Sequence, residues 1–468
     1  MQKKREKQSN EEQVKAHKDV TTQKHQLYVK EFKERPSYLT NLMLEVDHVK
    51  AVYYICIVCL LLMSLYSCCH DYLLYGRIKL GIDTFKLGFG GLHYTLGLLF
   101  AEHMLLFALF YGWKLWAFVW LRICKISFLC FIWSLLCLIS YIGAQLCMVY
   151  AITIMRLRLQ LRIISAFVLL METTRLLMKL HAFIRTNCGL VLGLESKAEP
   201  QVEFKFPKFN SFLYFLFAPT LLYRNSYPQT KTIRWSFAAK CLVEILAVTY
   251  LFACIYEQHM SVHFKDFGLK PVTLVDFISK IYSMLLPCSF ILLGFFYTVL
   301  HAVQNLGAEL LRFGDRLFYT DWWNGASYGV YFRRWNILVQ EWLYEFIYKD
   351  FYKHIFIGSK TLSSLSVFLI SALVHEYILG FSMRFCFPVM FVFFMFLGVP
   401  LALVARGMPK VVGNIFLWFS FLLGNAVMIT LYCMEYNSRR NLNQIFSKWQ
   451  DVLLPTTWTC LSDGEILS

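Results

Sequence analysis

The feature that most constrains the fold of this chain is a series of nine apolar stretches, each about as long as a membrane-spanning helix. A bilayer core about 30 Å thick needs roughly 20 apolar residues per helix, and 58% of the 468 residues are hydrophobic whereas 16% are charged. The sequence therefore predicts an all-α polytopic membrane protein. The expected transmembrane helices, about nine in number, are residues 51–69, 93–113, 128–152, 163–183, 237–256, 281–303, 361–381, 386–405 and 413–434.

The fourth stretch is the least apolar, because Glu172, Arg175 and Lys179 interrupt it. Residues three and four positions apart share one face of a helix. We therefore expect this helix to lie against protein or at the membrane interface. The sixth stretch contains Pro287, which predicts a kink.

The N-terminal residues predict the orientation in the membrane. Residues 1–36 contain no apolar core of a signal peptide, so we expect residues 1–40 to form a polar cytosolic segment and residues 41–460 a membrane-embedded domain. Nine spans then place 184–235 and 304–360 in the cytosol. This topology leaves one conflict with the positive-inside rule, because it puts a basic group on the lumenal side, namely Arg156, Arg158 and Arg162.

Charge and cysteine usage exclude two classes of partner. The formal net charge is +16, but the basic residues lie in the N-terminal segment and beside apolar stretches, which is typical of membrane-surface contact and not of nucleic-acid binding. Most of the 15 cysteines lie within apolar stretches and are expected to behave as small hydrophobic residues. No CxxC pair accompanies a set of ligands, so we expect no metal site.

One short segment combines aromatic and polar side chains in a way that an apolar chain does not need for folding. It consists of Phe318, Tyr319, Thr320, Asp321, Trp322, Trp323 and Asn324. The tryptophans alone could belong to an interfacial aromatic belt. A carboxylate between aromatic rings needs a donor, so we expect Asp321 to be hydrogen-bonded and structural.

His375 lies inside an otherwise apolar stretch, where an ionisable residue is costly and by default marks a functional site. A ring kept from water stays neutral and can accept a proton, as a general base must. The alternative is a structural histidine, bonded to a neighbouring carbonyl or to Glu376. Among the other histidines, His301 lies near the end of a span and is intermediate.

The residues after the aromatic segment offer groups that suit an acyl donor. Asn336 can donate to a developing oxyanion or orient a nearby imidazole without adding charge. Arg333 can bind a phosphate with two hydrogen bonds, which suits a nucleotide-bearing substrate. The alternative is that Arg333 and Arg334 place their charges at the membrane surface.

Several familiar site signatures are missing from the sequence. No histidine is followed five positions later by aspartate, and there is no Asp-His-His-Cys, GxxxxGK[ST] or HExxH pattern. Soluble-type glycerolipid acyltransferases, palmitoyltransferases, P-loop proteins and zinc proteases are therefore not expected.

Phe318–Asn324 matches the FYxDWWN motif of the membrane-bound O-acyltransferase superfamily, in the branch of the sterol and diacylglycerol acyltransferases. Asn336 and His375-Glu376-Tyr377 match the Asn and HEY elements of that branch. The chain resembles the sterol O-acyltransferases over about residues 40–460, with further matches at 44–48, 214–220, 223–228, 311–316 and 458–460.

This resemblance implies an enzyme of the endoplasmic-reticulum membrane that transfers a long-chain acyl group from acyl-CoA to the 3-hydroxyl of a sterol, making sterol esters for storage. It implies His375 as the base and Asn336 as its partner, with no cofactor besides acyl-CoA as co-substrate. A homodimer or homotetramer among membrane lipids is expected. By position, the resemblance assigns acyl-CoA contacts to Arg333, Gln340, Tyr348, Lys360 and Ser371, and sterol contact to His48.

Three departures from the family pattern bear on these expectations. Gln340 replaces a histidine that would contact the acyl donor, and Val330 stands where an asparagine is usual. Leu442 replaces a cysteine that would pair with Cys460, so Cys460 is expected to be free unless Cys433 reaches it.

Two other functions stay open at this point. A diacylglycerol acyltransferase would share the catalytic pair and make triacylglycerol. A non-enzymatic lipid-binding or transport protein would need His375 only for structure, although it would give no reason for the aromatic and acidic segment.

Overall fold

The computed structural model describes residues 30–78, 81–123, 126–195, 206–442 and 455–457. The chain divides into Met1–Lys33 and Glu34–Ser468, and every element below belongs to the second unit. Among the residues described, three isolated bridges are the only β pairing, so the expected all-α fold is confirmed. Most of the predicted segment 1–40 lies outside these ranges. Its boundary stays a prediction.

The first half of the unit is built from long helices. They are α2 (Tyr38–Glu45), α3 (Asp47–Tyr75), α4 (Ile82–Phe89), α5 (Leu92–Ile123), α6 (Ser127–Arg158), α7 (Ile163–Glu195), α8 (Phe209–Phe217), α9 (Trp235–Ile255), η1 (Tyr256–Met260) and α10 (Ser261–Phe264).

The second half alternates long helices with short ones. They are α11 (Leu274–Phe295), η2 (Phe296–Ala302), α12 (Val303–Leu310), η3 (Trp322–Asn324), α13 (Tyr328–Trp335), α14 (Ile337–Leu343), η4 (Tyr344–Tyr348), η5 (Phe351–Ile355), α15 (Lys360–Met383), α16 (Val389–Val392), η6 (Phe393–Gly398), α17 (Val399–Val404) and α18 (Lys410–Asn441).

Seven helical segments in the described ranges are long and apolar enough to cross a bilayer, which makes this a multi-pass membrane protein. They are Asp47–Tyr75, Ile82–Ile123, Ser127–Arg158, Trp235–Phe264, Leu274–Leu310, Lys360–Met383 and Lys410–Asn441. The predicted count of nine is not confirmed. The eighth expected stretch is the shorter apolar run Val389–Val404, and the fourth corresponds to α7.

Helix α7 lies within the protein, packed between α5 and α15, as its charged face predicted. Arg175 forms an ion pair with Glu172, with Nη2 and Oε1 2.5 Å apart. Lys179 is 1% exposed, and its ammonium donates to the carbonyls of Phe215, Leu216 and Ala218 at 2.6, 2.9 and 2.7 Å. The half-buried pair and the buried ammonium thus all have partners within the protein, which explains how α7 tolerates three charges on one face.

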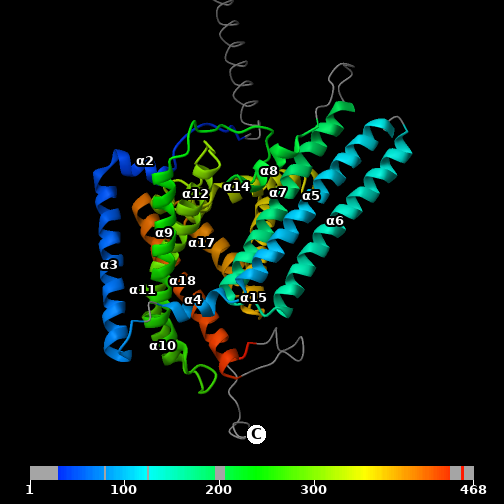
Figure 1. The fold of residues 1–468 in the computed structure, drawn as a ribbon. Helices are drawn as coiled ribbons and strands as arrows, with labels where there is room; N and C mark the ends of the chain where they lie inside the picture. The colour runs from blue at the N-terminus through cyan, green and yellow to red at the C-terminus, as the bar shows by residue number, and fades with distance from the viewer. Residues whose placement is uncertain (1–29, 79–80, 124–125, 196–205, 443–454, 458–468) are drawn as a thin grey trace, which may run out of the picture. The chain divides into compact units, whose positions relative to one another are not determined.

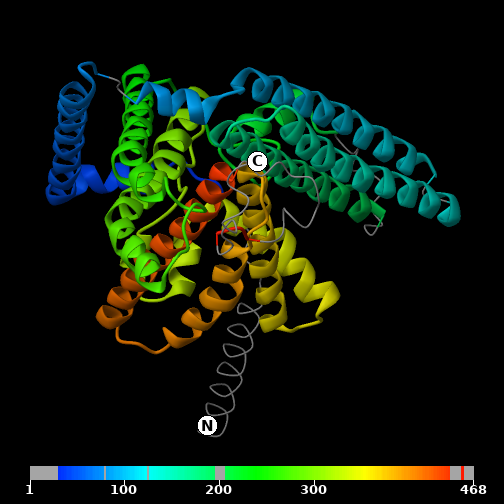
Figure 2. The same ribbon diagram turned by 90° about the horizontal axis from the view of Figure 1, so that it is seen from below.

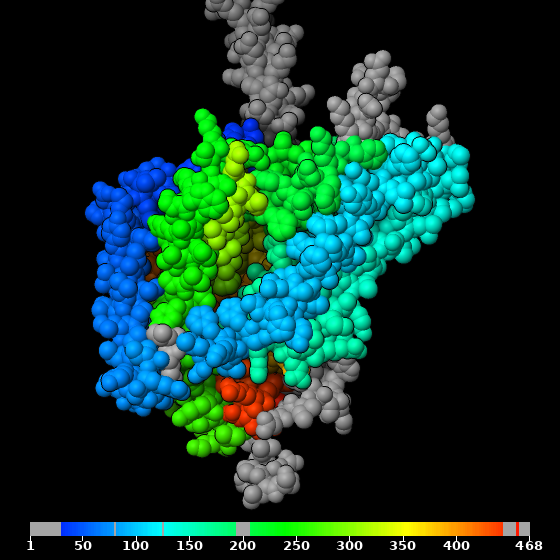
Figure 3. All heavy atoms as spheres, in the orientation of Figure 1, coloured from blue at the N-terminus to red at the C-terminus, as the bar shows by residue number. Residues whose placement is uncertain are grey.

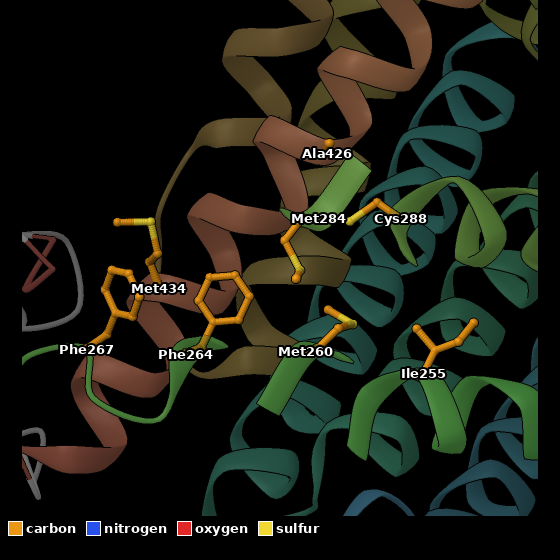
Figure 4. Packing of buried hydrophobic residues seen from close by; sticks show 8 residues of the cluster. All are labelled: Ile255, Met260, Phe264, Phe267, Met284, Cys288, Ala426 and Met434. Carbon is orange, nitrogen blue, oxygen red and sulfur yellow. The ribbon is translucent and has the colours of Figure 1, made fainter. Parts of the chain in front are cut away.

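Helices α5, α7 and α15 form one packed group, and helices α9, α11 and α18 form a second. Figure 4 shows the buried hydrophobic side chains of the core of this second group, which come from these helices, from η1 and α10, and from the turn that follows α10. Its buried members are Ile255, Met260, Phe264, Phe267, Met284, Cys288, Ala426 and Met434. Pro287 is buried within α11, which runs through it to Phe295.

The two groups of helices frame the site segments. Figures 1 and 2 both place α3 at one edge, beside α9, and α6 at the opposite edge, beside α5. Figure 3 shows the surface hollowed between α12 and α5, with segments later in the sequence at the back of the hollow. Arg185 on α7 pairs with Asp350 at 3.1 Å, so the predicted cytosolic segments 184–235 and 304–360 lie on the same side.

Candidate functional site

The aromatic segment clamps the junction between α13 and α14. The backbone N–H of Thr320 donates to the Arg334 carbonyl at 3.0 Å, and the N–H of Ile337 donates to the Phe318 carbonyl at 2.9 Å. These two bonds lie on either side of Asn336. Its own Oδ1 accepts from the N–H of Val339 at 3.2 Å and caps α14, so its amide Nδ2 is not used by the cap.

Trp322 is the centre of an aromatic cluster inside the protein. It is 2% exposed and packs against Phe296, Tyr331, Trp335 and Trp418 with ring centroids 4.7 to 6.0 Å apart. An interfacial belt therefore does not describe Trp322, because its ring faces protein on all sides.

The polar side chains of the segment have separate partners. Asp321 pairs with Arg334 at 3.0 Å, the structural role expected for it. The Tyr319 hydroxyl lies 2.5 Å from Nδ1 of His301. Burial raises the pKa of the Tyr319 phenol, so this hydroxyl is protonated and can donate. Asn324 is exposed, and Trp323 accepts through its carbonyl from Asn414 and Trp418 at 2.9 and 3.0 Å.

His375 lies on α15, and the preceding helical turn determines which of its nitrogens carries the proton. Nδ1 is 2.7 Å from the Ser371 carbonyl oxygen. A carbonyl can only accept, so Nδ1 is the protonated nitrogen and the Nε2 lone pair is available, as a general base requires. The bond to the Ser371 carbonyl is one of the two contacts expected of a structural histidine, and it leaves Nε2 free for either role; the other expected contact, a bond to Glu376, is not observed. Glu376 instead accepts from the N–H of Phe391 at 3.1 Å and the Tyr432 hydroxyl at 3.2 Å.

Aromatic rings connect the helix that carries His375 with the helix that ends at Asn336. Phe332 on α13 packs against Phe368 on α15 at 5.2 Å and against Phe394 on η6 at 6.3 Å. Phe394 in turn lies 4.9 Å from the His375 ring. Among the described residues no hydrogen bond joins Asn336 to His375, and these ring contacts are the link that we observe between their helices.

The residues assigned to acyl-CoA lie along α13 to α15. Arg333 and Lys360 are exposed, and Arg333 forms no ion pair with any residue that the structure describes. Tyr348 stacks between Tyr344 and Tyr352 at 5.4 and 6.0 Å. Ser371 lies one turn before His375, with its hydroxyl 3.4 Å from Nδ1. Gln340 lies on α14, one turn after Asn336.

His48 is not brought to this site by any contact that we observe. It is exposed near the start of α3, which packs along α9 and α2. Its assignment to sterol contact stays a prediction.

The structure shows where some of the residues lie that differ from the family pattern. Val330 lies on α13 and Leu442 directly follows α18. Cys433 is free and packs against the buried cluster that contains Met284 and Met434, whereas Cys460 lies outside the described residues. Across the described ranges, no group of three or more His, Cys, Asp and Glu side chains could hold a metal ion.

Sequence reasoning underweighted His301, which the structure places in the scaffold of the aromatic segment. It is 3% exposed and contacts both Tyr319 and Asn305, whose Nδ2 donates to the His301 carbonyl at 2.8 Å. The i, i+4 spacing of His301 and Asn305 was a usable signal. The contact with Tyr319 was not, because nothing in the sequence shows that the two segments meet.

Comparison with known proteins identifies the family of this chain. Residues 105–434 match the membrane-bound O-acyltransferase family. The chain is 33% identical over 431 residues to sterol O-acyltransferase 1 of Chlorocebus aethiops, which covers 90% of this chain and 76% of the relative. It is 32% identical over 438 residues to sterol O-acyltransferase 2 of Homo sapiens, covering 91% and 79%.

The matched region contains the aromatic segment, Asn336 and His375, so the similarity extends over the residues that form the candidate site. The chain belongs to the membrane-bound O-acyltransferase family.

Proposed function

We propose that this protein transfers a long-chain acyl group from acyl-CoA to the 3-hydroxyl of a sterol and so makes sterol esters for storage. The observation that carries the proposal is the orientation of His375, whose Nδ1–H donates to the Ser371 carbonyl and leaves Nε2 as a base. The sterol as acceptor is supported by relatives named sterol O-acyltransferase, similar over about nine-tenths of the chain.

In the proposed reaction, Nε2 of His375 removes the proton of the sterol hydroxyl while its oxygen attacks the thioester carbonyl. The C–S bond then breaks, and the protonated imidazole returns the proton to the CoA thiolate. Asn336 fits the role of oxyanion donor because its Oδ1 caps α14 and its Nδ2 is not used by that cap. The chemistry asks for no cofactor beyond acyl-CoA itself.

The aromatic segment acts as scaffold in this proposal. Its two backbone bonds fix the chain on both sides of Asn336, and its buried rings make that junction rigid. Acyl-CoA would be held by Arg333 and Lys360 through phosphate, with Tyr348, Gln340 and Ser371 along the same path. The hollow between α12 and α5 offers the sterol a route from the bilayer (Figure 3), and His48 would contact sterol at the membrane surface.

We further propose residence in the endoplasmic-reticulum membrane with a cytosolic N-terminus, and assembly as a homodimer or homotetramer. The support is the likeness to the sterol O-acyltransferases together with the pairing of Arg185 and Asp350, which keeps two predicted cytosolic segments on one side.

The decisive experiment is an assay of purified protein in lipid with labelled oleoyl-CoA, offering cholesterol and diacylglycerol in parallel. We expect labelled sterol ester from the parent protein and none above background from His375→Ala. His354→Ala, which changes an exposed histidine in η5, is the matched control and should keep full activity. Triacylglycerol as the main product would identify the diacylglycerol enzyme, and no product at all would favour a lipid-binding protein.

A further inference from the structure

Three arginines from different helices gather at one end of the bundle. Arg156 is in the last turn of α6, Arg162 directly precedes α7, and Arg384 caps the end of α15. Arg156 and Arg384 are close enough for their charges to repel, and so are Arg384 and Arg162. Like charges do not gather without an opposing charge, so this arginine cluster needs an explanation.

The side chain of Arg156 is buried, yet most of its donors are unused. It is 1% exposed. Nη2 donates to the Ser382 carbonyl at 2.5 Å, whereas Nε and Nη1 are buried with no partner among the described residues, as is Nε of Arg384. Burying an unpaired guanidinium is costly, and no carboxylate in the described ranges forms an ion pair with any of the three arginines.

A purely structural explanation accounts for only one of these donors. A cation near the C-terminus of a helix is favourable, and the bond from Arg156 to the Ser382 carbonyl is such a contact with α15. It leaves Nε and Nη1 of Arg156 unexplained.

The backbone at Arg384 gives a second, independent observation. Arg384 adopts φ of +67° at the end of α15, a conformation that favours glycine and is uncommon for a long side chain. A residue kept in an unfavourable backbone conformation suggests that its side chain is needed.

The cluster also lies where positive charge is not expected. Ser382 and Arg384 are at the end of α15 opposite to Lys360. Arg162 directly precedes α7, which runs from there toward Arg185. The predicted topology puts this end on the lumenal side, against the positive-inside rule. Topogenic charge therefore does not explain the cluster.

We propose that Arg156, Arg162 and Arg384 form a binding site for a phosphate group, supplied by the headgroup of a phospholipid in the leaflet that meets this end of the bundle. Exposed Arg162 and half-buried Arg384 lead inward to buried Arg156. Guanidinium groups match phosphate oxygens with paired hydrogen bonds. The stem of Arg162 packs closely on Gly90, where a Cβ would lie 2.6 Å from the Arg162 Cγ, so the absence of a side chain at Gly90 makes room for it.

The site lies at the end of α15 away from the proposed acyl-CoA path and does not depend on the proposed reaction. Its test is thermal unfolding of the purified full chain in uncharged detergent. The probes are short-chain phosphatidic acid, diacylglycerol of the same chain length, and inorganic phosphate. We expect phosphatidic acid to raise the unfolding temperature in a saturable way and diacylglycerol to have no such effect. Arg384→Gly should weaken the apparent affinity for phosphatidic acid roughly tenfold or more, because it removes a charge-assisted contact.

Arg384→Gly keeps the experiment interpretable, because glycine suits the backbone at this position and the variant should fold even if Arg156→Gln does not. Arg158→Gln is the matched control, since it removes an exposed arginine from the same end of α6 and should bind like the parent. An equal response to inorganic phosphate would assign the site to a free anion and overturn the lipid assignment. Equal affinity of Arg384→Gly and the parent, or no response to either phosphate compound, would overturn the site.

Discussion

The imidazole of His375 has two neighbours from Ser371, the carbonyl oxygen at 2.7 Å and the hydroxyl at 3.4 Å from Nδ1. Only the first has the length of a good hydrogen bond. The proton on Nδ1 is therefore held by a backbone atom, which no substitution at position 371 removes.

Ser371→Ala should accordingly keep sterol ester formation within about tenfold of the parent, because the loss of one weak hydroxyl contact is worth at most about 1 kcal/mol. Steady-state rates with varied oleoyl-CoA check this, with His375→Ala as the reference for complete loss. A loss in Ser371→Ala as large as in His375→Ala would mean that the hydroxyl, and not the carbonyl, orients the ring.

Glu376 is next to His375 in sequence but acts on a different element. Its carboxylate accepts from the N–H of Phe391 in the short helix α16 and from the Tyr432 hydroxyl on α18. The N–H groups of a first helical turn have no partner within the helix. Glu376 therefore fastens α16, and through it Phe394, against His375.

Glu376→Gln and Tyr432→Phe should each lower the free energy of unfolding by about 1 to 2 kcal/mol, and the double variant should lose less than the sum, because both remove one network. Thermal unfolding of the four proteins in detergent measures this. Strict additivity would show that the two side chains act separately.

At the scale of helices, the packing of α7 against α8 depends on hydrogen bonds made by one buried charged group, the Lys179 ammonium. The Lys179 ammonium holds three carbonyls at the end of α8, those of Phe215, Leu216 and Ala218. Water cannot replace it, because the side chain is buried.

Lys179→Met should therefore destabilise the protein by about 3 kcal/mol or more, since it leaves buried carbonyls without a donor. The matched control, Lys231→Met, changes an exposed lysine and should shift the unfolding temperature little. If Lys179→Met unfolds at the temperature of the parent, the carbonyls do not depend on the ammonium.

The helices were largely predictable from sequence because their length and apolar composition are local properties. The charges of α7 predicted that it lies against protein or at the membrane interface, but they could not decide between the two or show that Lys179 would bind carbonyls at the end of α8. The apolar stretch 386–405 was predicted to be a full transmembrane helix, but the helical run there, Val389–Val404, is shorter than the seven spans. For the site, the residue types of His375 and Asp321 indicated their chemistry. Their partners, Ser371 and Arg334, depend on local geometry, and the role of Phe394 depends on a contact between distant segments.

At the scale of the whole unit, hydrogen bonds and ion pairs join segments that the predicted topology places on one side. Thr230 donates through its N–H to the Arg312 carbonyl at 2.8 Å, and Arg185 pairs with Asp350. From Ile163 to Arg185, α7 rises about 33 Å at 1.5 Å per residue, which is the thickness of a bilayer core. Helix α7 is therefore long enough to cross the bilayer once and to separate the arginine cluster from the proposed acyl-CoA path. It is not among the seven apolar segments, because it carries charged residues.

This crossing predicts how single added cysteines react with a membrane-impermeant maleimide in endomembrane vesicles whose cytosolic face is outward. Lys231 and Lys353 are exposed and lie in the segments 184–235 and 304–360, which the pair of Arg185 and Asp350 joins. Lys231→Cys and Lys353→Cys should both be labelled in intact vesicles. Arg158 is exposed at the end of α6, just before α7 begins, and so lies on the opposite side of the membrane in this arrangement. Arg158→Cys should therefore be labelled only after detergent is added. The parent protein gives the baseline from its own cysteines. Labelling of Arg158→Cys in intact vesicles at the rate of Lys353→Cys would place both ends of α7 on one side and reject the crossing, because a polar reagent does not reach a cysteine behind an intact bilayer.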